Sequence, residues 1–123
     1  MLDSSALLAV LNLESGADQV VPLLDGSAIS AVNWSETFQK ALARDVRTEA
    51  LRRDVESLGV TIVPFRADEA EQAARAWLTT SAAGLSLGDR ACLTLAEREG
   101  IVAVTADRAW SRLSTTVQMR IIR

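Results

Sequence analysis

The stretch from Leu85 to Trp110 constrains the fold of this chain most, because it combines a helix that has two clear ends with a short β-rich run. Ser86 can cap a helix that begins at Leu87, and Gly100 can end that helix. The uncharged run Ile101–Val104 is typical of a buried strand. We therefore expect a loop, a helix and a strand in succession, which is the alternating unit of α/β proteins.

The same alternation continues along the rest of the chain. We expect a very short first strand at 1–2, a helix after Asp3, a second helix over 17–25 kinked at Pro22, a strand at 28–30, a helix opened by an Asn33–Glu36 capping box and running to 44, a helix over 51–58, a strand at 60–63, an alanine-rich helix from Asp68 and a last strand at 117–122. This order predicts a mostly parallel central sheet of four to five strands with helices on both faces.

Composition limits the chemistry that the chain can perform. There is no histidine, which excludes imidazole catalysis and the Ser-His-Asp and Cys-His nucleophile schemes. The single Cys92 allows no internal disulfide, and its place in a helical apolar pattern indicates a buried residue in a reducing compartment, by default the cytoplasm. The apolar run Ala6–Leu11 is far shorter than the ~20 residues of a membrane span, so we expect no membrane association. We expect one domain over residues 1–123.

Four acidic residues fall at or just after the expected βα turns, and these turns share one edge of a parallel sheet. They are Asp3, Glu36, Asp89 and Asp107. Each one alone could simply stabilise a helix start by ~0.3–1 kcal/mol. Capping does not require the four to meet, however, and each close pair of carboxylates repels by ~1–4 kcal/mol. We therefore expect them to converge in space at a binding site.

A site that gathers carboxylates must either protonate some of them or bind a cation. Oxygen ligands without histidine or cysteine suit Mg²⁺ or Mn²⁺. The expected chemistry is metal-assisted hydrolysis of phosphodiesters, in which the metal activates water and offsets the charge on the phosphate.

The order and spacing of four segments resemble the PIN-domain ribonucleases and, within them, the VapC-type toxins of toxin–antitoxin systems. The resemblance covers nearly the whole chain. The segments are Leu2–Leu8, Ile29–Glu36, Leu85–Leu93 and Thr105–Trp110. It implies a three-layer PIN-like fold and an endoribonuclease that cuts single-stranded or looped RNA. It also implies a homodimer, silenced by a VapB-like antitoxin whose peptide covers the acids.

The resemblance further implies that the acidic quartet holds Mg²⁺ or Mn²⁺. The expected direct ligands are Asp3 and Asp89, with Glu36 and Asp107 as further candidates, and Ser5 and Thr105 supply neighbouring hydroxyl groups. Two departures from the family pattern are visible. Only two residues precede the first acid, where relatives have a fuller strand, and a fifth acid close after Asp107 is absent.

The net charge of −3 is unusual for a nuclease, but the four site acids supply −4, so all other residues sum to +1. Twelve of the thirteen basic residues are arginine, which suits bidentate contacts with phosphate. Arg90 and Arg108, each beside a site acid, are the phosphate-binding candidates. The three tryptophans, Trp34, Trp77 and Trp110, are expected in the core or at a dimer contact.

Two other functions are compatible with parts of this pattern. A phosphoacceptor receiver domain has a similar length and acidic character, but it needs a lysine at a sheet end, and Lys40, the only lysine, falls inside an expected helix. The alternative that stays open is a catalytically silent PIN-fold module that only binds a partner protein.

Overall fold

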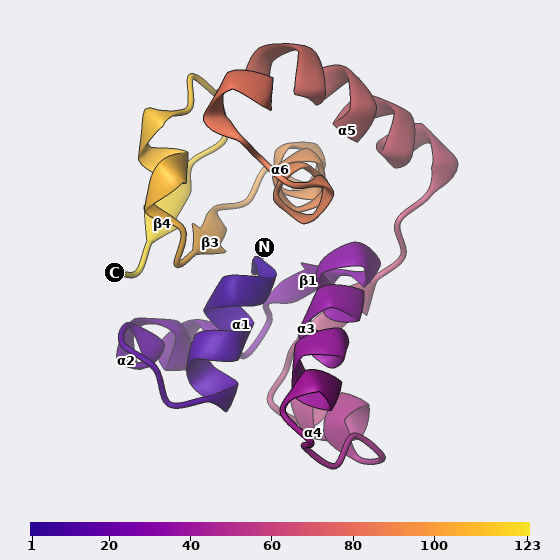
Figure 1. Ribbon diagram of the computed structural model, residues 1–123, viewed down its shortest axis with the longest axis vertical. Helices are drawn as coiled ribbons and strands as arrows, with labels where there is room; N and C mark the ends of the chain where they lie inside the picture. Colours follow the sequence, from indigo (N-terminus) through magenta and orange to yellow (C-terminus); the bar gives the residue numbers. More distant parts are fainter.

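In the computed structural model, which describes residues 1–123, parallel strands separate two groups of helices (Figure 1). The strands are β1 (Ala28–Ser30), β2 (Thr61–Val63), β3 (Ala103–Thr105) and β4 (Met119–Ile121). β1 pairs with β2 and β3 pairs with β4, both in parallel. Leu2 joins the pairs by bridging Ile29 on one side and Val104 on the other. The predicted parallel sheet is confirmed, and its first strand is reduced to this bridging residue.

The two faces of the sheet contribute to two hydrophobic clusters, because alternate residues of a strand point to opposite faces. Leu2, Ile29 and Val104 belong to one cluster. This cluster also contains residues of α1 (Ser4–Leu11), α2 (Ala17–Val20) and α4 (Leu51–Ser57). Met1 and Ala103 belong to the other cluster, with Cys92 of α6 (Leu87–Glu99). Cys92 is fully buried, as its helical pattern predicts.

Helix α6 begins and ends where the sequence predicts. The Ser86 hydroxyl accepts a hydrogen bond from the backbone N–H of Asp89, and Gly100 ends the helix in the left-handed conformation at φ 64°. Helix α5 (Ala67–Thr80) packs across α6 on the side away from the strands (Figure 1). The buried carboxylate of Glu69 forms an ion pair with Arg98 across these two helices.

The start of α3 (Ala31–Ala43) differs from the predicted Asn33–Glu36 capping box. Ser30, the last residue of β1, is the N-cap, and its hydroxyl accepts a hydrogen bond from the N–H of Asn33. The helix begins earlier because Ser30 already lies in extended backbone and offers its oxygen three residues ahead. Asn33 and Glu36 therefore both lie inside the helix, one turn apart on one face.

Other boundaries are shorter than predicted. The expected helix over 17–25 is α2 followed by a 3₁₀ turn, η1 (Val21–Leu23), that contains Pro22, because proline removes an α-helical hydrogen bond. The strands expected over 101–104 and 117–122 are β3 and β4, of three residues each. The remaining 3₁₀ turns are η2 (Ser81–Ala83) and η3 (Arg108–Arg112). None of the helices combines the length and the apolar character that crossing a bilayer requires.

The three tryptophans occupy different environments. Trp110 is fully buried, and Trp34 is partly buried with its ring edge-to-face against Phe38. Trp77 is 53% exposed on α5, beside Leu78, which is 75% exposed. Trp110 thus lies in the core, as expected, whereas for exposed Trp77 only the expected dimer contact stays a prediction.

Candidate active site

Three of the four predicted acids cap the start of a helix. Asp3 caps α1, Asp107 caps η3, and Asp89 forms a capping box with Ser86 in α6. Glu36 lies in the second turn of α3 and caps nothing. Asp3 directly follows Leu2, which lies between β1 and β3 in the sheet, and Asp107 comes two residues after β3. Both acids therefore lie at the carboxyl end of the sheet. Capping and convergence are therefore compatible in this fold.

Asp3 is at the centre of the arrangement. Its side chain is almost completely buried, and its Oδ2 accepts hydrogen bonds from Ser5 Oγ at 2.5 Å and Thr105 Oγ1 at 3.0 Å. Asn33 Nδ2 donates to its Oδ1 at 3.0 Å. Asp3 forms no ion pair, whereas Glu69, another buried acid, pairs with Arg98.

Asn33, on α3, connects this helix to two other elements that carry site acids, α1 and α6. Its amide is fully buried and donates both to Asp3 and to the carbonyl of Gly88 at 3.0 Å, while its Oδ1 accepts from the Ser30 hydroxyl. This residue was not among the predicted site residues because its sequence pattern indicates a helix cap. The signal that could have identified it is Ser30, an equally good cap residue that directly follows the expected strand. A helix capped by Ser30 contains Asn33 and places it on the same face as Glu36.

Glu36 is held from two sides. Its Oε2 accepts a hydrogen bond from Ser4 Oγ at 2.7 Å, and its Oε1 pairs with Lys40 at 3.0 Å. Helix α6 approaches so closely that a Cβ on Gly88 would lie 2.9 Å from Glu36 Oε2 and 3.3 Å from Asn33 Nδ2. The lack of a side chain at Gly88 thus permits the close contact between α3, which carries Glu36, and α6, which carries Asp89.

Asp89 and Asp107 are also positioned by neighbouring groups. Asp89 Oδ2 accepts from the N–H of Ser86 at 2.7 Å, and its Oδ1 accepts from Trp110 Nε1 at 3.2 Å. Asp107 is exposed, and its own N–H donates to Thr105 Oγ1, the hydroxyl that donates to Asp3. The two hydroxyl residues predicted to support the site, Ser5 and Thr105, thus both contact Asp3.

The electrostatics centre on Asp3. Burial raises the pKa of its carboxyl, the Ser5 hydrogen bond opposes this shift, and the nearby charges of Asp89 and Glu36 raise the pKa further. Asp107 is not among the groups that shift it. Three of the four acids are therefore electrostatically coupled, and the fourth is linked through Thr105.

The donor set suits a hard divalent cation, although no three acidic side chains are close enough to form a ready-made metal cage. Asp3 is a buried carboxylate with no basic partner, beside two further carboxylates and two hydroxyl groups. A cation would offset the burial and the repulsion that together raise the pKa of Asp3. Carboxylate and hydroxyl oxygens of this kind are the donors that a hard divalent cation prefers.

The two predicted phosphate-binding arginines have other contacts. Arg90 Nη1 donates to the carbonyl of Ala73 and ties α6 to α5, while its Nε is buried without a partner. Arg108 is exposed, and its Nε donates to the main-chain oxygen of Arg123 at 3.1 Å. The guanidinium of Arg108 therefore lies at the surface, and that of Arg90 is partly engaged within the fold.

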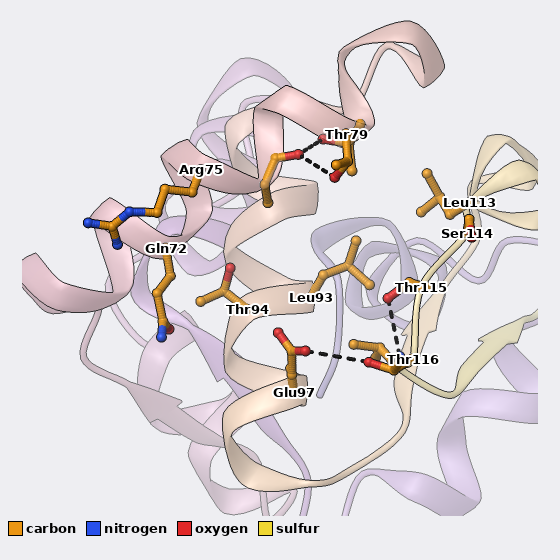
Figure 2. A pocket seen from close by; sticks show the side chains of 13 residues that line it. Gln72, Arg75, Thr79, Leu93, Thr94, Glu97, Leu113, Ser114, Thr115 and Thr116 are labelled. Carbon is orange, nitrogen blue, oxygen red and sulfur yellow. Dashed lines mark hydrogen bonds between the residues drawn. The ribbon is translucent and has the colours of Figure 1, made fainter.

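Two grooves adjoin the acids. One, of about 620 Å³, is lined by Glu36, Gln39, Phe65 and Leu87, among others, and contains no basic side chain. The other, of about 290 Å³, is lined by Ser5 and Lys40 and by the arginines Arg44 and Arg123. A third cavity of about 650 Å³ lies elsewhere, between α5, α6 and the segment 113–117, where Thr79, Thr94 and Thr116 supply hydroxyl groups (Figure 2). None of the four acids lines this third cavity.

The parallel sheet with helices on both faces, and the buried carboxylate at its carboxyl end, define an α/β domain with acidic side chains at one edge of the sheet. The PIN domain family model matches residues 1–115. The chain therefore belongs to the PIN domain family, whose members are generally nucleases that use divalent metal ions.

Solved structures share this fold at low sequence identity. A toxin–antitoxin complex from Klebsiella pneumoniae is 18% identical with a TM-score of 0.69, over 95% of this chain and 97% of that chain. PAE2754 from Pyrobaculum aerophilum is 21% identical with a TM-score of 0.62, over 96% of this chain and 87% of that chain. No curated protein sequence matches.

Proposed function

We propose that this protein is a metal-dependent endoribonuclease and the toxin component of a VapBC-like toxin–antitoxin system. The observation that carries the nuclease assignment is the buried Asp3 carboxylate, which has no basic partner and is coupled to Asp89 and Glu36. The other buried acid, Glu69, is paired with Arg98. Asp3 instead lies in an arrangement that favours a divalent cation, in a family whose members are generally nucleases.

The residues of the chain have separate tasks in this proposal. Asp3 and Asp89 would hold Mg²⁺ or Mn²⁺, with Glu36 and Asp107 completing the acidic site. The bound ion would activate water and offset charge on the phosphodiester. Ser5, Thr105 and Asn33 fix the Asp3 carboxylate by hydrogen bonds, so that its oxygens need not reorganise during the reaction. Trp110 fixes Asp89 in the same way.

Metal dependence is tested by incubating the protein with single-stranded RNA, with and without EDTA. We expect cleavage with Mg²⁺ or Mn²⁺, no cleavage after chelation, and recovery when the metal is restored. Cleavage that persists undiminished in EDTA would disprove the metal-dependent mechanism. Absence of cleavage with either metal, for a folded protein, would favour the silent binding module.

The toxin role is supported by the structural similarity to a chain of a toxin–antitoxin complex over nearly its whole length. In this proposal the protein acts in the cytoplasm and is silenced by a VapB-like antitoxin. Expression alone in a bacterial host should therefore arrest growth, and co-expression of its cognate antitoxin should restore growth. Normal growth during strong expression of the protein alone would contradict the toxin role.

A homodimer is part of the same proposal. Trp77 and Leu78 lie adjacent on α5 and remain more than half exposed, a combination that favours a protein contact. Light scattering at micromolar concentration should give the mass of two chains, and a monomer under these conditions would contradict the prediction.

A further inference from the structure

We propose that the groove lined by Lys40, Arg44 and Arg123 binds a backbone phosphate of single-stranded RNA next to the cleaved one. This inference rests on the proposed nuclease function and assigns a substrate subsite to it. The groove measures about 290 Å³ and is formed by one side of α1, the loop after it, the last turn of α3 with Arg44, and residue 123.

The groove continues directly from the acidic site. Ser5, one of its lining residues, donates to Asp3 Oδ2, and Lys40, another, pairs with Glu36 Oε1. A nucleotide chain whose phosphate lies at the acids would therefore extend over Ser5 and Lys40. Its neighbouring phosphate would enter this groove.

The charge of the groove suits a polyanion. Three of its lining side chains are cationic and one, Glu14, is acidic, so the lining sums to +2. The chain as a whole carries −3. A negatively charged protein with acids at its site repels RNA, so local positive charge beside the site is required for binding. The other groove beside the acids contains no basic side chain.

Glu14 holds Arg44 and Arg123 close together, because both pair with its carboxylate. Arg123 Nη1 donates to Glu14 Oε2 at 3.0 Å, and Arg44 Nη2 lies 3.8 Å from Glu14 Oε1. Asn12 and Arg123 donate hydrogen bonds to Glu14 and lower the pKa of its carboxyl, which keeps it ionised. Each guanidinium has five N–H donors, so both retain free donors for phosphate oxygens.

The test measures binding of a labelled single-stranded RNA by fluorescence anisotropy in EDTA, where cleavage is absent. The variants are Arg44→Gln and the double variant Arg44→Gln/Arg123→Gln, with melting curves to verify folding. The matched control is Arg75→Gln, an exposed arginine that pairs with Glu71 and lines the cavity of Figure 2. A variant at Lys40 is avoided because it would also alter Glu36.

We expect the double variant to weaken binding at least tenfold and Arg44→Gln to weaken it by a smaller factor. The slope of log K against log salt should flatten by about 0.7 for each RNA phosphate that the variant no longer neutralises. Arg75→Gln should bind as the wild type does. If both groove variants bind RNA with unchanged affinity and salt slope, the subsite is disproved. This conclusion holds even if the same variants no longer bind an acidic peptide partner.

Failure of the subsite and failure of the nuclease function give different results. Wild-type protein that cuts RNA, together with groove variants that bind and cut normally, would overturn the subsite alone. Wild-type protein that neither binds nor cuts RNA would overturn both.

Discussion

At the scale of single residues, the site depends on neutral groups that orient the acids. Asn33 uses both amide protons, one on Asp3 and one on the carbonyl of Gly88. It thereby joins the acid before α1 to the first turn of α6, where Asp89 lies. A buried amide that contacts two elements far apart in the sequence sets their separation, and the spacing of the acids follows from it.

Substitution of this amide should affect both stability and activity. Asn33→Ala leaves a buried carboxylate and a buried carbonyl without their donor, so we expect the free energy of unfolding to fall by about 1–3 kcal/mol. We also expect half-maximal cleavage to require about 10–100 times more metal, because Asp3 is no longer held in its orientation. Urea denaturation and metal titration of cleavage measure the two effects.

Thr37→Val provides the matched control. Thr37 is equally buried on α3, but its hydroxyl bonds only to the carbonyl of Asn33 in its own helix. The metal requirement should stay unchanged. An equal rise in the metal requirement for both variants would mean that Asn33 acts only through the stability of α3.

Glu14 predicts a dependence of stability on pH. Hydrogen bonds from Asn12 and Arg123 hold the pKa of its carboxyl below the usual value of 4.5. The folded state thus binds its proton less tightly than the unfolded state, and the stabilisation is present above pH 4.5 and lost as the pH falls through the lowered pKa. Wild type should exceed Glu14→Gln in stability at pH 7, and the difference should shrink below about pH 4.5 in urea denaturation. A difference that is constant with pH would contradict the assignment.

At the scale of elements, local chemistry predicted helices better than strands. Helix α6 begins at Ser86–Leu87 and ends at Gly100 as expected, because cap residues act within their own turn. Strands of three residues carry little pattern, and their ends depend on the neighbour that pairs with them. The start of α3 differs from the prediction because both Ser30 and Asn33 are good cap residues, and only the end of β1 decides between them.

Two glycines of α6 should differ in what their substitution affects: activity for Gly88, which lies at the close approach of α3, and stability for Gly100, which ends the helix. Gly88→Ala would place a Cβ 2.9 Å from Glu36 Oε2 and displace that carboxylate. Cleavage should drop at least tenfold, while stability changes by less than about 1 kcal/mol, because alanine favours the helix. Gly100→Ala, at φ 64° with open space around it, should cost about 1–2 kcal/mol and leave the cleavage rate per folded molecule unchanged. Melting curves and initial rates compare them, and normal activity in Gly88→Ala would refute the close contact.

At the scale of the whole molecule, the parallel sheet places the acids at one edge, where Asp3 is coupled to Asp89 and Glu36. The βα turns of a parallel sheet share one edge, so the four acids and that edge could be predicted from their order in the sequence. The contacts among them could not, because Ser4–Glu36, Asn33–Gly88 and Trp110–Asp89 join elements distant in sequence. The arginines Arg44 and Arg123 could not be predicted for the same reason, since they meet only at Glu14.

In the proposed function, acids that cap helices also form a catalytic metal site. Asp89 and Asp68 provide a matched pair, because both lie in the first turn of a helix, whereas only Asp89 lies among the other acids. Asn keeps the size of either side chain and removes its charge. A pure capping role predicts similar, small effects for the two substitutions.

The decisive measurement is the rate of RNA cleavage in saturating Mg²⁺ for wild type, Asp89→Asn and Asp68→Asn, each verified as folded. A metal site predicts that Asp89→Asn lowers the rate by about two to three orders of magnitude, the scale of removing one electrostatic interaction from a catalytic site, while Asp68→Asn cuts at the wild-type rate. Wild-type cleavage by Asp89→Asn would show that the acids are caps and that this site is not catalytic.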